Sequence, residues 1–231
     1  MIAVIIPTYC EAQNIEELIR RLESLNFDLW IIVVDDSSPD GTASIVKALM
    51  NSYGNITLIE RPKKLGIGTA ILNGLKLISS SGKDVDCVAV MDADLSHDPD
   101  DLPKLVEGID EFDVVVGSRY VEGGLIEGWG LKRRMISGVA NLLANKILGL
   151  GVKDATSGYR VYRFKAMLEV MDKIENFGFP FQIESLYHLI KEGFKVGEKP
   201  IEFVNRKRGK TKLNLKEILS FIYTLIKLKF K

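Results

Sequence analysis

The chain has 231 residues, of which 46% are hydrophobic and 27% charged, a composition that excludes a disordered protein and suffices for one large domain. The formal net charge is zero, but Lys195–Lys231 holds 11 Lys and Arg against 3 Asp and Glu, so this tail carries +8 and the rest −8. A basic tail on an acidic body favours an anionic partner, such as phosphates or a membrane surface. A solvated lysine-rich helix would explain the same charge.

Cysteine content and apolar segments bound the cellular setting. Cys10 and Cys87 are too few for a disulfide framework or a zinc site, which favours a reducing cytosol. The N-terminus lacks the basic start and long apolar region of a signal peptide. The longest charge-free apolar stretches, Met135–Asn145 and Ile218–Ile226, fall short of the roughly 18 residues that span a bilayer. We therefore expect a cytoplasmic protein, peripheral on the cytoplasmic face of a membrane.

The first half of the chain alternates buried strands with amphipathic helices. The predicted strands are short Val- and Ile-rich runs at Ile2–Ile6, Leu29–Asp35, Asn55–Glu60, Asp86–Asp92 and Asp113–Ser118. Helices are predicted over Ile15–Leu25 and from near Gly41, Gly68 and Pro99. This order predicts a doubly wound, mostly parallel α/β sheet flanked by helices.

The second half is less regular. The Gly-rich segment at 121–130 is interpreted as a flexible loop, and an apolar helix is predicted over Leu131–Leu148. Much of this helix is expected to pack in the core, with a membrane-interfacial position as the alternative. Two short strands at Tyr159–Arg163 and Lys199–Val204 are expected to flank a helix over Phe181–Glu192, and a last helix covers Leu215–Lys231. With no repeat or clear linker, residues 1–212 are predicted to form one catalytic domain, followed at 213–231 by a basic amphipathic helix.

Two acidic clusters lie at the ends of two predicted strands. Asp35 and Asp36 end the second strand, and Asp92 and Asp94 end the fourth. Parallel sheets bind ligands beyond the carboxyl ends of their strands, so both clusters should face one crevice. Strand-ending carboxylates also serve as helix caps, an alternative that stays open for Asp35 and Asp40.

The Asp92-Ala93-Asp94 spacing suits a divalent cation held against a diphosphate, because Mg²⁺ and similar hard ions take one or two carboxylates plus phosphate oxygens. Such an ion would neutralise charge on a leaving nucleotide. A bare DxD arises often by chance, but its place at a strand end beside a second acidic cluster adds weight. His97 borders the same mouth, where a structural role is the commoner one.

Residues after the first strand border the same crevice. Pro7, Tyr9 and Glu11 lie in the run IPTYCE, where a tyrosine can stack on a nucleobase and Glu11 or Asp36 can accept hydrogen bonds from base or ribose. Glu11 is also a favourable acid in the first turn of a helix. The run LGIGT at 65–69 is interpreted mainly as a turn before a helix, since it is not a dinucleotide-binding G-x-G-x-x-G.

Basic residues supply the other half of the predicted site. Arg119 follows the fifth strand, Arg133 and Arg134 begin the apolar helix, and Arg206 and Lys212 lie in the run VNRKRGKTKL. Guanidinium groups suit phosphate oxygens, although any one of these residues could be ordinary surface charge. An anionic acceptor would need such residues to enter a crevice lined with carboxylates.

Taken together, these runs resemble polyprenyl (dolichol) phosphate mannose synthases of glycosyltransferase family 2. The matching segments include VVDDSSPDGT, MDADLSHDP, VVGSRYVEGG, LKRRMISGVAN, DATSGYRVYR and FVNRKRGKTKLN, which span nearly the whole chain in family order. The resemblance implies a GT-A fold that binds a nucleotide sugar and Mg²⁺ or Mn²⁺. It departs from the family where Cys10 replaces the usual asparagine and Asp98 a common proline.

The resemblance also implies roles for the residues that match. Pro7, Tyr9, Glu11 and Asp36 would bind the nucleotide, together with Asp92 and Lys212. Asp92 and Asp94 would form the metal pair, with Asp94 the direct ligand. Arg119, Arg133, Arg206 and Lys212 would meet donor or lipid phosphates, with Asp92, Asp94 and Arg119 as the catalytic set. Some members carry a metal-binding glutamine where this chain has Ser96, which leaves that contact open.

The expected reaction is the inverting transfer of mannose from GDP-mannose to polyprenyl phosphate at a membrane surface, with or without a membrane subunit. Transfer of glucose from UDP-glucose to the same acceptor is the alternative closest to it, and a glycan acceptor is another. A non-catalytic nucleotide-binding subunit belongs to a different class, which the Asp92 and Asp94 pair disfavours. A sugar-1-phosphate nucleotidyltransferase is disfavoured because IPTYCE is not a Gly-rich phosphate loop.

Overall fold

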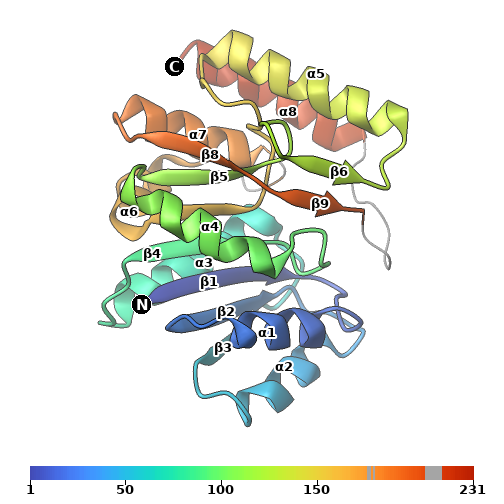
Figure 1. The fold of residues 1–231 in the computed structure, drawn as a ribbon, viewed down its shortest axis with the longest axis vertical. Helices are drawn as coiled ribbons and strands as arrows, with labels where there is room; N and C mark the ends of the chain where they lie inside the picture. Colours follow the sequence, from blue (N-terminus) through green and yellow to red (C-terminus); the bar gives the residue numbers. More distant parts are fainter. Residues whose placement is uncertain (176–177, 179, 206–214) are drawn as a thin grey trace.

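A computed structural model describes residues 1–175, 178, 180–205 and 215–231. One seven-stranded sheet of order β3-β2-β1-β4-β7-β5-β8 runs through the molecule, and a two-stranded sheet, β6-β9, lies beside it (Figure 1). Arg206 and Lys212, both predicted to bind phosphate, fall outside the described residues.

The first half folds as the predicted series of strands and helices. Its elements are β1 (Ile2–Thr8), α1 (Ile15–Ser24), β2 (Leu29–Asp35), α2 (Thr42–Met50), β3 (Ile56–Glu60), α3 (Ile67–Ser80) and β4 (Cys87–Val90). β1 pairs in parallel with both β2 and β4, and β2 with β3. Alternate residues of β1 point to opposite faces, one packed against α1 and α2 and the other against α3, which explains the unbroken apolar runs.

The second half adds strands on the other side of β4. Its elements are η1 (Pro99–Asp101), α4 (Leu102–Glu107), η2 (Gly108–Asp110), β5 (Val114–Ser118), β6 (Leu125–Glu127), α5 (Leu131–Leu148), β7 (Arg160–Arg163), α6 (Phe164–Val170), η3 (Met171–Lys173), α7 (Phe181–Lys191), β8 (Val196–Pro200), β9 (Glu202–Val204) and α8 (Leu215–Lys229). β7 is antiparallel to β4 and β5, whereas β5 and β8 are parallel. The prediction of a mostly parallel α/β sheet is confirmed; helix α6 was not predicted.

Two predictions about the second half are wrong. The Gly-rich segment is not all loop, because Leu125–Glu127 forms β6 with a single buried residue, Ile126. The predicted strand over Lys199–Val204 is divided at Ile201, so that β8 joins the main sheet and β9 pairs with β6. Strands of three residues carry too little alternation to be recognised from sequence alone.

Helix α5 was expected to pack largely in the core, and that interpretation is also wrong. Only Asn141 and Ala144 of its 18 residues are buried. It lies side by side with α8 at one end of the molecule (Figure 1). α8 in turn buries Phe221, Leu225 and Leu228. No helix in the described part of the chain is long and apolar enough to cross a bilayer.

Candidate functional site

Backbone strain is concentrated at the carboxyl ends of three adjacent strands. Among the described residues, the non-glycine residues with positive φ are Cys10 (60°), Ser37 (52°) and Leu95 (59°). They follow β1, β2 and β4, which lie next to one another in the sheet. Left-handed backbone at non-glycine positions costs free energy and tends to persist at functional sites. The strain therefore marks the edge where the sequence placed the acidic clusters.

The two aspartates after β2 have different surroundings. Asp35 is buried and accepts hydrogen bonds from the Thr8 hydroxyl (2.8 Å) and from the backbone and hydroxyl of Ser38 (2.8 and 2.6 Å). Asp36 is buried in an ion pair with Arg61 and accepts the backbone N–H groups of Leu65 and Gly66, both at 3.1 Å. Asp35 thus ties β1 to β2, while Asp36 ties β2 to the loop before α3.

The residues after β1 lie against that loop. Lys64 places its ammonium group 4.0 Å above the ring of Tyr9. Glu11 is buried, where its carboxylate accepts a hydrogen bond from Asn14 (2.9 Å). Pro7 is half-buried near the end of β1. The structure therefore brings together the predicted nucleotide-binding residues Pro7, Tyr9, Glu11 and Asp36 at one edge.

Asp40 precedes Gly41, the N-cap residue of α2, and binds the first helical residue without being the N-cap itself. Its carboxylate accepts the backbone N–H and hydroxyl of Thr42 (3.1 and 2.6 Å) and the N–H of Ala12 (3.0 Å). Burial opposes ionisation, but these hydrogen bonds outweigh it and lower the pKa of Asp40. The residue joins α2 to the turn after β1.

The Asp92–Asp94 segment follows β4 in a tight turn. The Asp92 side chain is 38% exposed, and Asp94 is buried with Oδ1 accepting the Ser96 N–H at 3.0 Å. Ser96 Oγ is buried and has no hydrogen-bond partner among the described residues. This turn, with Leu95 in the left-handed region, holds two carboxylates and an unused hydroxyl close together.

His97 stabilises the backbone of this turn through its side chain. Its Nδ1 accepts the backbone N–H of Asp92 (3.1 Å), so the proton of the neutral imidazole lies on Nε2. Burial lowers the pKa of His97, which favours that neutral form. The ring stacks on Tyr159 at 5.1 Å and meets the edge of Phe203 at 5.5 Å. His97 thus has the structural role considered from the sequence.

Strand β9 runs along the same turn. The Val204 N–H donates to the Ser96 carbonyl (3.2 Å), and His97 and Phe203 form an isolated antiparallel bridge. β9 also pairs with β6, which precedes α5. The small sheet therefore connects the acidic turn to the first turn of α5.

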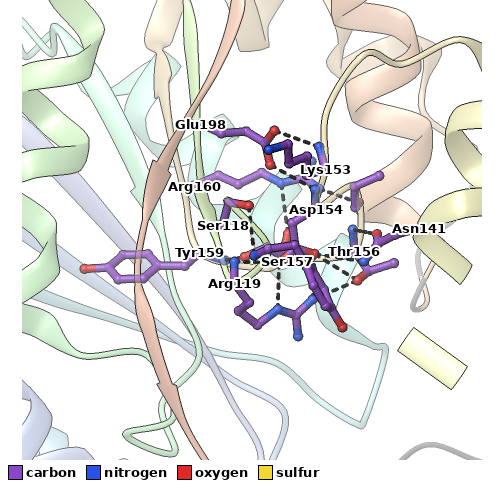
Figure 2. Close-up of polar contacts among 12 residues, drawn as sticks. Ser118, Arg119, Asn141, Lys153, Asp154, Thr156, Ser157, Tyr159, Arg160 and Glu198 are labelled. Carbon is purple, nitrogen blue, oxygen red and sulfur yellow. Dashed lines mark hydrogen bonds and ion pairs between the residues drawn. The ribbon is translucent and has the colours of Figure 1, made fainter. Parts of the chain in front are cut away.

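Arg119 lies in a buried network centred on Asp154. Its Nε and Nη2 each donate to the Asp154 carboxylate at 2.7 Å, and Nη2 also reaches the Thr156 hydroxyl at 2.8 Å. Asn141 of α5 donates to the same carboxylate (3.3 Å), whereas the Tyr159 ring points away from the network (Figure 2). Arg119 therefore fixes the 154–156 loop, and its predicted role in catalysis and phosphate binding stays a prediction.

Arg119 and Arg133 share an aromatic neighbour. The guanidinium carbon of Arg119 lies 5.2 Å from the Trp129 ring centre and that of Arg133 lies 4.0 Å from it. Arg133 also donates to the Asn205 side chain (2.9 Å). Two of the predicted phosphate-binding residues are thus brought together beside β9.

Several residues of the site were not singled out from the sequence. Glu198 accepts the backbone N–H groups of Lys153 and Asp154, and buried Arg160 donates to three backbone carbonyls. The run DATSGYR contains Asp154 and Arg160 and carried the family resemblance, so it was the available signal. For Glu198 the sequence contains no such signal, because a charged residue in a strand does not reveal which backbone N–H groups it binds.

The acidic turn fits a divalent cation only in part. Within the described ranges, no group of three or more His, Cys, Asp or Glu side chains is placed to hold a metal ion. Mg²⁺ and related ions commonly take one or two carboxylates, with phosphate oxygens and water completing the shell. Asp92, Asp94 and the unpartnered Ser96 hydroxyl match that arrangement if a diphosphate supplies further oxygens.

The chain belongs to the glycosyl transferase family 2, whose sequence pattern matches residues 3–171. It is therefore an enzyme of the glycosyltransferase class, on a GT-A fold. It is 37% identical over 215 residues to a polyprenol monophosphomannose synthase of Mycolicibacterium smegmatis, covering 91% of this chain and 80% of that protein. It is 36% identical over 214 residues to an undecaprenyl-phosphate mannosyltransferase of Micrococcus luteus, covering 92% and 87%.

Solved structures share the fold at lower identity. The glucosyl-3-phosphoglycerate synthase of Mycobacterium tuberculosis, determined with Mn²⁺ and UDP, superposes with a TM-score of 0.68 at 20% identity and covers 99% of this chain and 78% of that one. A mannosyltransferase of Pyrobaculum calidifontis, determined with GDP-mannose and Mn²⁺, gives 0.61 at 19%, covering 99% and 62%. These likenesses confirm the predicted GT-A architecture.

Proposed function

We propose that the protein transfers mannose from GDP-mannose to a polyprenyl phosphate with inversion at the anomeric carbon. The observation that carries this proposal is that acidic and basic residues meet at β9. The turn that holds Asp92 and Asp94 is hydrogen bonded to this strand, Arg119 lies over the ring of Phe203 in it, and Arg133 lies over Trp129, which contacts Phe203. The names of the two sequence relatives supply the acceptor class and the sugar.

The carboxylates are assigned to the donor. Asp92 and Asp94 would hold Mg²⁺ or Mn²⁺, which when bound neutralises charge on the diphosphate. Tyr9, Glu11 and Asp36 lie along the same sheet edge, where they would bind the nucleoside. Asp36 is already held by Arg61 and two backbone N–H groups, so it shapes the nucleoside pocket as part of a fixed loop.

The basic half is assigned to the acceptor. Arg133 lies at the first turn of α5, and Arg119 is fixed by Asp154 close to the same tryptophan. A lipid phosphate oriented there would attack the anomeric carbon as the bond to the diphosphate breaks, with the electron pair leaving on the nucleoside diphosphate. A phosphate monoester has a second pKa of about 6 and is already ionised at neutral pH, so no strong base is needed to activate it as the nucleophile. Alignment and charge stabilisation remain the protein's tasks.

We further propose that α5 and α8 bring the enzyme to its lipid acceptor by lying on a membrane. Leu131, Met135, Val139 and Leu142 form an exposed apolar stripe on α5, and Leu219, Tyr223, Ile226 and Phe230 form one on α8. Exposed Lys132, Arg134, Lys146 and Lys229 surround these stripes and suit anionic headgroups. The protein would then be peripheral on the cytoplasmic face, where polyprenyl phosphate is reached without a spanning helix.

The reaction is tested by incubating the protein with Mn²⁺ or Mg²⁺, a polyprenyl phosphate and labelled GDP-mannose or, separately, labelled UDP-glucose. We expect mannose label in the organic phase; glucose label instead would keep the acceptor and replace the sugar. Asp94→Asn keeps an acceptor for the Ser96 N–H and so preserves the turn, yet should lose at least about 100-fold in activity. Asp110→Asn, at an exposed site, is the matched control.

A further inference from the structure

Three side chains converge on one point above Gly158, beside the acidic turn. A methyl group placed on this glycine would lie 3.5 Å from Nε2 of Gln182, 3.6 Å from Cε1 of His97 and 3.8 Å from Oδ1 of Asp92. These residues come from α7, the turn after β4 and the loop before β7. The glycine leaves open the space that its side chain would otherwise fill.

The Gln182 side chain has a buried polar atom without a hydrogen-bond partner in the described part of the protein. The residue is 6% exposed, and this atom is the amide oxygen Oε1. An unpaired buried amide costs roughly 1–3 kcal/mol. Native proteins rarely leave such a group unused, so this one needs an explanation beyond folding.

The position of this amide is firmly fixed. Arg160 is fully buried and donates to the backbone carbonyls of Gln182 (2.6 Å), Ser157 (2.9 Å) and Ala155 (2.8 Å). It thereby joins the first turn of α7 to the residues just before Gly158. A buried guanidinium that donates to carbonyls of both segments holds Gln182 and Gly158 at a set separation, as a preformed binding site requires.

The groups around this point decide which kind of ligand it can bind. It offers the Asp92 carboxylate as acceptor, the Gln182 amide as donor or acceptor, and the carbon edge of His97. A phosphate would be repelled by the Asp92 carboxylate, and none of the three described atoms nearest the point belongs to a lysine or arginine. A sugar hydroxyl can donate to the carboxylate and accept from the amide, while a carbon of the same ring lies against the imidazole.

We propose that Gln182 binds a hydroxyl group of the transferred hexose, together with Asp92, in the space kept open by Gly158. This inference rests on the proposed function, because it places the donor sugar next to the acidic turn. It makes Gln182 a residue that recognises the sugar rather than the nucleotide or the lipid.

The test compares binding of the sugar nucleotide with binding of the nucleoside diphosphate alone. Gln182→Met keeps the length of the side chain and removes both amide atoms. Gly158→Ala fills the space without a clash, since its added methyl group meets nothing closer than 3.5 Å and the backbone lies outside the positive-φ region. Gly54→Ala, where the methyl group meets nothing within 4 Å, is the control. Calorimetry with Mn²⁺ gives the Kd of GDP-mannose and of GDP, and transfer assays give kcat/KM.

We expect Gln182→Met and Gly158→Ala each to weaken GDP-mannose binding and lower kcat/KM by about 10- to 100-fold, with the Kd of GDP within about twofold of wild type. An equal loss of GDP binding would make Gln182 a metal or nucleotide ligand and overturn the inference, as would unchanged donor binding. If the wild type binds the donor but transfers no sugar to polyprenyl phosphate, the proposed acceptor fails, while selective loss in the two variants still supports the Gln182 contact. A wild type that binds no sugar nucleotide overturns both.

Discussion

The ion pair between Arg119 and Asp154 is buried and reinforced by further hydrogen bonds. Both side chains are buried, and the carboxylate also receives hydrogen bonds from the Arg119 backbone (3.0 Å) and from Asn141. Burying either charge alone costs several kcal/mol, which the pair recovers only through this geometry. The network therefore keeps the loop before β7 and helix α5 in fixed positions around the site.

Removing one partner of this pair should be far more harmful than removing both. Asp154→Ala leaves the Arg119 guanidinium buried without its counter-charge, and we expect a loss of about 3–5 kcal/mol in the free energy of unfolding. The double variant Arg119→Met with Asp154→Leu, which buries no charge, should lose less than Asp154→Ala. Urea unfolding monitored by circular dichroism measures both, and equal losses would contradict the role assigned to the pair.

The same pair predicts a pH dependence of stability. Burial disfavours the charged form of Asp154, but hydrogen bonding and attraction from Arg119 outweigh it and lower the pKa of that carboxyl. A folded pKa below the unfolded value of about 3.9 gives a stabilisation that is complete above that pH and is lost as the pH falls through the folded pKa. The difference in unfolding free energy between wild type and Asp154→Asn should be constant from pH 5 to 7 and shrink below about pH 4. A difference that instead grew on acidification would be inconsistent with a lowered pKa.

Cys10 offers a prediction about backbone strain. It is exposed, its φ is 60°, and its N–H donates to the Ser38 hydroxyl at 2.9 Å. Asparagine tolerates the left-handed region better than most residues, which accounts for the asparagine usual at this position in the resembling family. Cys10→Asn should raise the free energy of unfolding by a few tenths to about 1 kcal/mol. Cys10→Val, β-branched at the same φ, should lower it, and thermal unfolding of the two variants checks the opposite signs.

Among single residues, the carboxylates of the acidic turn could be predicted from the sequence, because apolar runs identify the ends of strands. Asp92 and Asp94 follow such a run directly, and the sheet topology then places them at an edge with Asp36. Asp154 and Gln182 do not follow such a run. Arg160 lies in a predicted strand, but its hydrogen bond to Gln182 spans 22 residues, and the ion pair of Asp154 with Arg119 spans 35. Pairings of that kind depend on the packing of the second half, which local pattern does not specify.

At the scale of elements, strand β9 supports the acidic turn without supplying a ligand to it. Phe203 packs against His97 and Trp129 at 5.5 and 5.3 Å, and the next residue, Val204, is hydrogen bonded to Ser96. Phe203→Ala should therefore loosen the turn and raise several-fold the Mn²⁺ concentration needed for half-maximal activity. The control is Phe27→Ala, the same substitution at a side chain that is 37% exposed in the segment between α1 and β2. A fall in kcat with unchanged metal dependence would argue against the supporting role of β9.

The longer helices and the long strands could be predicted, whereas the short helix α6 and the small sheet could not. α5 was predicted with its observed bounds because its apolar period is clear over 18 residues. The apolar period does not reveal whether the apolar side of the helix packs in the core or remains exposed. For α5 we expected core packing, and the helix is instead mostly exposed. β6 and β9 have three residues each, so their pairing is a product of the tertiary fold and not of a local pattern.

At the scale of the whole molecule, the exposed apolar residues are unevenly distributed. On α5 and α8 they recur at intervals of three or four residues, so that each helix presents one continuous stripe, and the helices lie side by side. Extended apolar patches on a protein surface mark interaction sites. The basic residues beside the stripes and the polyprenyl acceptor of the proposed reaction both favour a membrane as the partner.

Substitution of the stripes should therefore detach the protein from membranes. Leu131, Leu142, Tyr223 and Phe230 are among the most exposed residues of this face, at 75, 65, 64 and 86%. Replacing all four with serine removes apolar groups that each contribute roughly 1.5–3 kcal/mol when fully buried, so vesicle affinity should fall by more than about 100-fold. Sedimentation with vesicles of mixed anionic and zwitterionic lipid measures the change.

The matched control places serines at three exposed apolar positions elsewhere, namely Phe27, Met50 and Leu168, and should bind vesicles as the wild type does. Mannose transfer to a short, water-soluble polyprenyl phosphate should survive in both variants, because neither touches the acidic turn or Arg133. Transfer to a long acceptor embedded in vesicles should fail only in the α5–α8 variant. The membrane assignment is wrong if the wild type does not bind vesicles and is a dimer, whereas the α5–α8 variant is a monomer. The face would then bind a second copy of the chain.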